Sequence, residues 1–116
     1  MTANSDSAIG RNRNVMAYET SQTFTCDPAR LFMIVGDILQ WPAEGQPRML
    51  KRREFDLAQV AFADATRATL TLSRTEAGSG STVEISHDLC TSLEQVNHWR
   101  EYWNEFLSAI RSRVEL

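Results

Sequence analysis

The second half of the chain, residues 67–116, most constrains what this sequence can fold into. In residues 67–73 apolar side chains alternate with polar ones, a pattern typical of a half-buried strand. A Gly- and Ser-rich turn over residues 77–81 leads to a second alternating run, residues 82–89, whose inward face carries Val83, Ile85, His87 and Leu89. From Thr91 the apolar period becomes helical. The sequence therefore predicts a β-hairpin followed by one long amphipathic helix.

The predicted helix has one apolar stripe and one polar stripe. The apolar members are Leu93, Val96, Trp99, Trp103, Phe106, Leu107, Ile110 and Val114, whereas Glu94, His98, Glu101, Glu105 and Ser112 fall opposite. Two capping boxes are possible at the helix start, Thr91 with Glu94 or Ser92 with Gln95. Either one would satisfy backbone amides of the first turn, so the start of the helix is well defined.

The first half predicts a strand followed by two short helices. Residues 16–26 form an extended run, in which Met16, Tyr18, Phe24 and Cys26 share a face. Asp27 and Pro28 then resemble an N-cap and a first helical residue. This helix should end at Gly36.

Asp37 is placed to cap a second helix over residues 38–40, which Trp41 and Pro42 should stop. After Trp41, residues 49–55 and 58–63 are the only candidates for further strands. The expected order is strand, two short helices, strands and long helix.

Length and charge limit the class of protein. The 116 residues, 42% of them hydrophobic, suit one domain, expected over residues 15–116 after a disordered polar tail, residues 1–14. The net charge of -3 argues against a nucleic-acid partner, because such binding needs clustered cations. The basic run of Lys51, Arg52 and Arg53 is interpreted as a charged edge strand that discourages aggregation. The sequence shows no signal peptide, membrane segment, phosphate loop or metal-ligand spacing, so we expect a cytoplasmic protein without a membrane, cofactor or metal.

Two blocks of this sequence resemble the START-like (SRPBCC, helix-grip) superfamily, in particular the branch named for the activator of heat-shock-protein-90 ATPase. The first block runs from Phe24 to Phe32 and is followed by Asp37 and Trp41. The second covers residues 68–103, with the last hairpin and the Trp-containing helix. The resemblance implies an α+β fold in which a curved antiparallel sheet wraps a long C-terminal helix.

The chain departs from that family in the middle, since only 24 positions separate Trp41 from Thr66. About five strands should fit, so the cavity that the family keeps between sheet and helix should be reduced or open on one side. An open apolar side would need a partner, and we expect a homodimer. The family's antiparallel pairing of first and last strands also implies that Cys26 and Cys90 lie too far apart for a disulfide.

The ligand-binding residues expected from this reasoning are those that face the reduced cavity. They are Tyr18, Trp41, Phe62, His87, Trp99, Trp103 and Phe106. His87 could hydrogen-bond a ligand or shuttle a proton, but the simpler interpretation is a structural histidine at the rim of the core. The aromatic residues could line a cavity or simply pack as core. Arg100 could reach the cavity mouth or form an ion pair, and His98 is interpreted as surface.

Three functions remain open at this point. The leading hypothesis is a non-catalytic START-like module that binds a small apolar or amphipathic molecule. The first alternative is an interaction module, either a homodimer or a chaperone-linked adaptor. The second is an enzyme similar to polyketide cyclases or dehydratases, with His87 as acid or base and Tyr18 as hydrogen-bond donor. Since no reactive constellation stands out, the sequence favours binding over catalysis.

Overall fold

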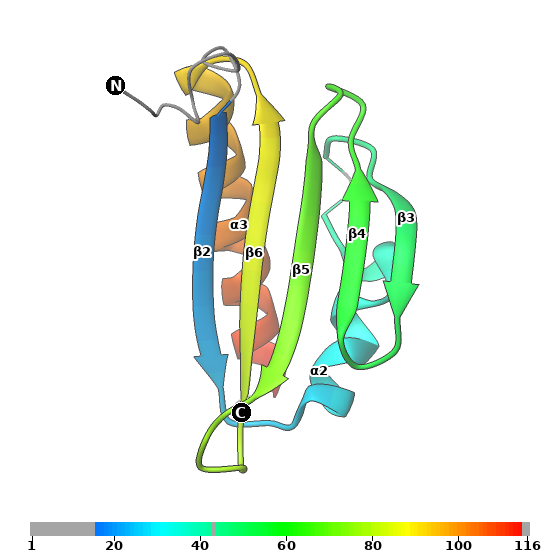
Figure 1. Cartoon of the computed structure of the whole chain (residues 1–116), viewed down its shortest axis with the longest axis vertical. Helices are drawn as coiled ribbons and strands as arrows, with labels where there is room; N and C mark the ends of the chain where they lie inside the picture. The colour runs from blue at the N-terminus through cyan, green and yellow to red at the C-terminus, as the bar shows by residue number, and fades with distance from the viewer. Residues whose placement is uncertain (1–15, 43, 115–116) are drawn as a thin grey trace, which may run out of the picture.

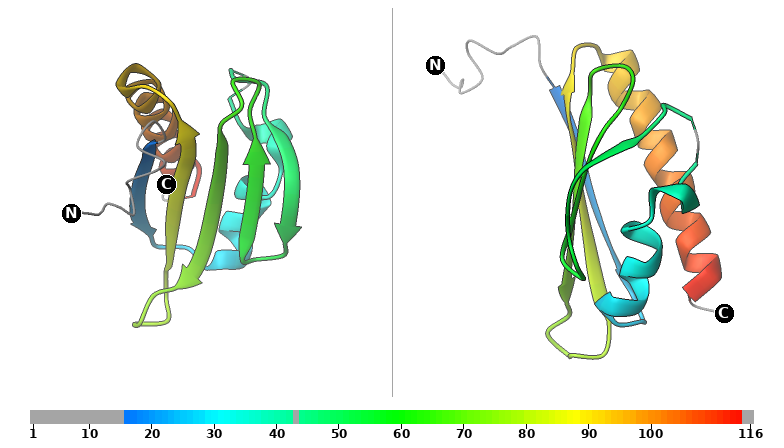
Figure 2. Two further views of the ribbon diagram at one scale, coloured as in Figure 1. Left: turned by 45° about the horizontal axis from the view of Figure 1, so that its top comes forward. Right: turned by 90° about the vertical axis from the view of Figure 1, so that its right-hand side faces the viewer.

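The computed structural model describes residues 16–42 and 44–114 and has two layers (Figures 1 and 2). A five-stranded antiparallel sheet in the order β2-β6-β5-β4-β3 forms one layer, and the helices cover one of its faces. The strands are β2 Met16–Phe24, β3 Arg48–Arg53, β4 Leu57–Ala61, β5 Arg67–Arg74 and β6 Ser81–Cys90. The helices are α2 Pro28–Val35, the 3-10 helix η1 Ile38–Gln40 and α3 Leu93–Val114. The predicted fold class and element order are confirmed; the predicted tail lies outside the described residues.

The helix starts follow the local sequence. The side chains of Asp27 and Asp37 accept backbone N–H groups at 3.0 and 3.1 Å and thereby begin α2 and η1. At α3 the second of the two possible capping boxes forms, because Ser92 Oγ accepts the Gln95 N–H at 3.1 Å. The Gln95 side chain in turn accepts the Thr91 N–H at 2.7 Å. Each helix therefore begins where its capping residue predicts.

One irregularity in β6 corrects the predicted alternation. Tyr18 of β2 pairs with His87, but Met16 pairs with Cys90, so β6 carries one extra residue. Leu89 takes up this bulge with φ 67 and is 40% exposed, so its predicted inward orientation is wrong. Because the bulge shifts the side-chain parity by one residue, Cys90 is turned into the core instead.

The apolar stripe of α3 differs from the prediction at two positions. Leu93 is 64% exposed, so the buried stripe begins at Val96. Tyr102, which the sequence analysis did not include, is buried beside Trp103 with 4.9 Å between ring centroids. The buried stripe of α3 is therefore wider than predicted and richer in aromatic residues.

Two further predictions, on the basic run and on the two cysteines, agree with the structure. The basic residues 51–53 belong to β3, which is an edge strand as expected. Cys26 lies just beyond one end of β2 and Cys90 pairs with the other end, and no disulfide joins them.

Candidate functional site

His87 lies at the centre of an aromatic cluster between the sheet and α3. Its side chain is fully buried and stacks on Trp99, with 4.3 Å between ring centroids, and on Phe62, with 5.1 Å. Trp103 lies 5.9 Å away at a tilt, and Phe62 and Trp99 are themselves 4.4 Å apart. The interior that the sequence analysis reserved for a reduced cavity is therefore filled here by packed rings.

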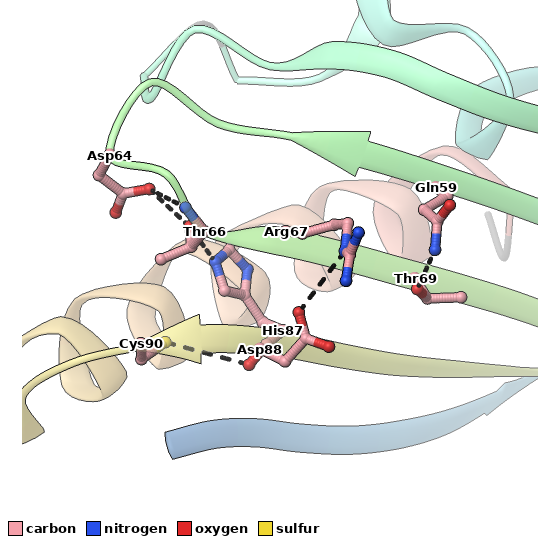
Figure 3. Close-up of polar contacts among 8 residues, drawn as sticks. All are labelled: Gln59, Asp64, Thr66, Arg67, Thr69, His87, Asp88 and Cys90. Atoms are coloured by element: carbon pink, nitrogen blue, oxygen red, sulfur yellow. Dashed lines mark hydrogen bonds and ion pairs between the residues drawn. The ribbon is translucent and has the colours of Figure 1, made fainter. Parts of the chain in front are cut away.

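Both ring nitrogens of His87 have protein partners. The indole Nε1 of Trp103 donates to His87 Nδ1 at 3.0 Å. An indole N–H can only donate, so Nδ1 must accept and the proton of the neutral ring sits on Nε2. Nε2 then donates to Thr66 Oγ1 at 2.7 Å (Figure 3). The tautomer is fixed, and neither nitrogen is open to a substrate.

The hydrogen-bond chain continues from Thr66 to a carboxylate at the surface. Thr66 donates both its hydroxyl and its backbone N–H to Asp64 Oδ1, at 2.5 and 3.0 Å (Figure 3). The other oxygen of Asp64 accepts from Trp99 Nε1 and from Gln95 Nε2, both at 2.9 Å. Asp64 thus ties the β4–β5 turn to the start of α3.

The pKa values agree with this arrangement. Burial lowers the pKa of His87 to about 4; the charge of Asp64 opposes this shift and that of His98 adds to it. For Asp64, partial burial raises the pKa, but the hydrogen bonds from Thr66, Trp99 and Gln95 outweigh it and leave the pKa below its ordinary value. At neutral pH the pair is a neutral imidazole and a carboxylate, with the threonine hydroxyl between them.

The loop before β3 closes the cluster from the side. Gly45 has φ +84, and a Cβ at this position would lie 2.7 Å from the Trp99 ring. Its carbonyl accepts the Ala63 N–H at 2.9 Å. Only glycine combines this backbone conformation with such a close approach, so the loop can lie directly against the ring of Trp99.

The seven predicted binding residues divide into three groups in the structure. Phe62, His87, Trp99 and Trp103 form the central cluster described above. Trp41 and Phe106 extend it, with 5.0 Å between their ring centroids. Tyr18 is only half-buried and lies under the guanidinium of Arg100, whose Cζ is 5.5 Å from the ring centroid.

Arg100 also donates to Asn97 Oδ1 at 3.0 Å, and the ion pairs found among the described residues do not include Arg100. His98 is exposed on the outer side of α3, as expected, and lies 3.6 Å from Glu44.

Sequence reasoning missed Asp64, Thr66 and Tyr102. The first two could have been found, because an Asp two residues before a Thr favours a side-chain turn in which the carboxylate accepts the Thr N–H. Tyr102 donates its hydroxyl to the Pro42 carbonyl at 3.1 Å, and burial raises its pKa. Tyr102 follows Trp99 by three residues and therefore lies on the same side of the helix, which was the signal in the sequence.

A shallow groove lies next to the cluster, between the α2–η1 segment and the C-terminal half of α3. Its volume is about 220 Å³. The lining residues are Ile34, Gln40, Trp41, Pro42, Phe106, Ala109, Ile110 and Arg113. Six of the eight are apolar, and Gln40 and Arg113 add an amide and a guanidinium. The groove thus offers an apolar surface beside one cation.

A second, larger hollow lies on the opposite face of the sheet. Its volume is about 470 Å³, and it is lined by Glu19, Thr20, Ser21, Thr69, Thr71, Glu84, Ile85 and Ser86. Seven of these eight residues carry a hydroxyl or a carboxylate group. Among the residues that the structure describes, no group of three or more His, Cys, Asp or Glu side chains is placed to hold a metal ion.

Comparison with known proteins identifies the fold. No family model and no curated protein matches the sequence. Solved structures do match, among them the Aha1 dimer from Colwellia psychrerythraea, with TM-score 0.73 and 11% identity over 87% of this chain and 97% of that one. An AHSA1-like protein from Rhizobium etli gives TM-score 0.65 and 13% identity over 84% and 80% of the two chains. XoxI from Bacillus cereus gives TM-score 0.68 and 13% identity over 84% and 94%.

These matches show that the chain shares its fold with the Aha1 dimer and the AHSA1-like protein, which is the fold that the sequence resemblance implied. At such low identities they establish the architecture and leave the activity to the site itself. No helix within residues 16–42 and 44–114 is long and apolar enough to cross a membrane.

Proposed function

We propose that this chain is a small-molecule-binding module that holds a small amphipathic anion in the groove between α2–η1 and α3. The observation that carries the proposal is the combination of an apolar surface, formed by Trp41 and Phe106, with the guanidinium of Arg113 in one groove. An apolar chain would pack on the rings while its carboxylate meets the cation. The proposal moves the expected binding site from the packed centre around His87 to the edge of the aromatic cluster.

The size of the groove restricts the ligand. A water molecule occupies about 30 Å³ of liquid, so 220 Å³ corresponds to a handful of solvent molecules. This is below the usual range of about 300–1,000 Å³ for drug-sized ligands. A short-chain carboxylic acid fits this description, and hexanoate is a suitable probe.

The three tryptophans give a test that locates the binding site. Each indole N–H has a different partner: the Ile34 carbonyl for Trp41, Asp64 for Trp99 and His87 for Trp103. In a ¹H–¹⁵N spectrum titrated with hexanoate, we expect the Trp41 indole signal to move while the other two stay in place. Shifts of Trp99 and Trp103 alone would instead place the ligand in the centre of the core and overturn the groove proposal.

Three variants complete this experiment. Arg113→Gln should weaken hexanoate binding at least threefold and leave binding of the neutral hexanamide unchanged, whereas Arg30→Gln, at an exposed arginine on α2, should change neither. Ala109→Trp should fill the groove and abolish the Trp41 shift. No response of any indole signal to hexanoate would contradict the proposal.

A homodimer is the second candidate function, and one observation favours it: the Colwellia structure with the same fold is described as a dimer. An enzyme that uses His87 finds less support, because both ring nitrogens are engaged by Trp103 and Thr66.

A further inference from the structure

The outer face of the sheet, opposite the helices, has no second layer among the described residues (Figure 2, right). Over the central strand β5 its outward side chains are Arg67, which lies 3.9 Å from Asp88 of β6, and three short polar ones, of which Thr69 and Thr71 are half-buried and Ser73 is exposed. Their neighbours Ser86 on β6 and Gln59 on β4 are likewise half-buried, and Gln59 donates to Thr69 at 3.3 Å (Figure 3). The face is therefore polar and carries no large apolar side chain over β5.

The strand registers place five of these residues in one row across the whole sheet. Glu19 of β2 pairs with Ser86, Ser86 with Thr69, Thr69 with Gln59, and Gln59 with Lys51 of β3. Directly paired residues of an antiparallel sheet point to the same face. The row thus begins with an anion, ends with a cation, and carries hydroxyl and amide groups between them.

In the adjacent row the acidic and basic residues lie toward the same two edges of the sheet as in the first row. Ser21, Glu84, Thr71, Leu57 and Arg53 follow one another across the five strands. Its acidic member lies on β6 and its basic member on β3. The two rows together give the outer face an acidic side over β2 and β6 and a basic side over β3.

This distribution is self-complementary. A two-fold axis that runs along β5 would place β2 of one copy over β3 of the other and keep each row at its own level. Glu19 then faces the partner's Lys51, Ser86 faces the partner's Gln59, and Thr69 faces its own counterpart. In the adjacent row Glu84 faces the partner's Leu57, next to Arg53 on the neighbouring strand. Arg67 also faces its own counterpart, and each copy of Arg67 keeps Asp88 of its own chain beside it at 3.9 Å. A symmetric interface of this kind uses the same patch twice.

We propose that the outer face of the sheet binds a second copy of this chain about a two-fold axis parallel to β5. This proposal names the surface of the homodimer, our second candidate function, and is independent of the ligand groove on the other side of the sheet. The hollow of about 470 Å³ over the acidic side would receive the partner's longer side chains, Gln59 and Lys51.

The available area fits a weak dimer. With about 4.8 Å between strands and about 3.3 Å per residue, five strands of roughly eight residues present a face of roughly 600 Å². Standard interfaces bury about 800 Å² per partner, and this one lacks an apolar centre. We therefore expect a concentration-dependent dimer held largely by charge, which added salt weakens.

The first test uses the unmodified full-length protein in sedimentation velocity at 50 mM and 500 mM NaCl. We expect a monomer–dimer equilibrium whose dissociation constant rises at least tenfold at the higher salt. Amide signals of Thr69, Ser86 and Gln59 should shift on dilution, whereas those on the exposed side of α3 should not. A monomer at 0.5 mM protein and low salt would overturn the proposal, as would dilution shifts confined to α3.

Charge reversal then tests the geometry. The variants Glu19→Lys/Glu84→Lys and Lys51→Glu/Arg53→Glu should each be monomeric at concentrations where the unmodified chain is dimeric. A matched control for the first variant, Glu76→Lys/Glu101→Lys, makes the same change in net charge at exposed positions away from this face and should remain dimeric.

Mixing the two face variants gives the decisive result. In a mixed dimer the reversed charges of one variant face reversed charges of opposite sign on the other, and the unchanged charges face each other as in the unmodified dimer. The mixture should therefore form a heterodimer although neither variant dimerises alone. Circular dichroism confirms that both variants are folded. A mixture that stays monomeric, or a control that dissociates like the face variants, would exclude the proposed arrangement.

Discussion

At the scale of single residues, the hydrogen-bond chain from Trp103 through His87 and Thr66 to Asp64 makes the core sensitive to acid. The pKa of His87 is about 4 in the folded protein and about 6.5 in an unfolded chain. Between these values the unfolded state binds more protons, so the free energy of unfolding falls as pH drops from about 6.5 to 4. The full difference corresponds to roughly 3 kcal/mol.

Urea unfolding at pH 7.5 and pH 4.5 measures this loss. His87→Gln should remove most of the pH dependence in this window, whereas His98→Gln, at an exposed histidine, should preserve it. Asp64 contributes at lower pH, because its pKa lies below the ordinary value and its stabilisation is lost only as the carboxylate is protonated. An unfolding free energy of the His87→Gln variant that still falls by about 2.5 kcal/mol between these two pH values would refute the assignment.

Thr66 supplies a second prediction at this scale. Its hydroxyl accepts from His87 and donates to Asp64, so Thr66→Val leaves a buried imidazole N–H without a partner. We expect a loss of about 1–3 kcal/mol in the free energy of unfolding. Thr71→Val makes the same chemical change on the outer face of the sheet and should be nearly neutral. Equal effects of the two substitutions in chemical denaturation would contradict the role of Thr66.

At the scale of elements, the capping box of α3 predicts a local contribution to stability. Ser92→Ala removes the acceptor of the Gln95 N–H and should cost about 1 kcal/mol. Ser108→Ala, at an exposed position inside the same helix, should be neutral or slightly stabilising because Ala has the higher helix propensity. Thermal unfolding followed by circular dichroism compares the two, and a Ser108→Ala loss equal to that of Ser92→Ala would argue against the cap.

The elements themselves were predictable because their signals are local. Helix starts are predicted by capping residues within one turn of the sequence, namely Asp27, Asp37 and Ser92. The alternation in β5 and β6 indicates which face of the sheet is buried. The bulge at Leu89 was not predictable, since it depends on how β6 pairs with β2 at Met16. The alternation rule holds only while the register is unbroken.

The site was less predictable than the elements for a related reason. Parity correctly turned His87 toward α3, and helical spacing brought Trp99 and Trp103 to the same face. Whether these rings surround a cavity or fill it depends on the close approach of Gly45 and on the hydrogen bonds of Asp64, which come from loops distant in sequence. A pattern along one element cannot report the volume left between several elements.

At the scale of the whole molecule, the two proposed surfaces lie on opposite faces of the sheet. The groove belongs to the helical layer, and the dimer face is the bare side of β2, β6, β5, β4 and β3. Between them lies a core of closely packed aromatic rings, and coupling between sites requires an element with two states. We therefore expect ligand binding and dimerisation to be independent.

Independence can be measured as a ratio of dissociation constants. Hexanoate should bind the monomeric Glu19→Lys/Glu84→Lys variant with the same affinity, within twofold, as the dimeric Glu76→Lys/Glu101→Lys control. The comparison between these two variants cancels the long-range effect of net charge, because both gain the same charge, and 0.3 M NaCl screens the remainder. Because coupling is reciprocal, hexanoate at saturation should also leave the dimer dissociation constant unchanged. A difference of fivefold or more in either direction would mean that the aromatic core transmits a change from Trp41 to the sheet.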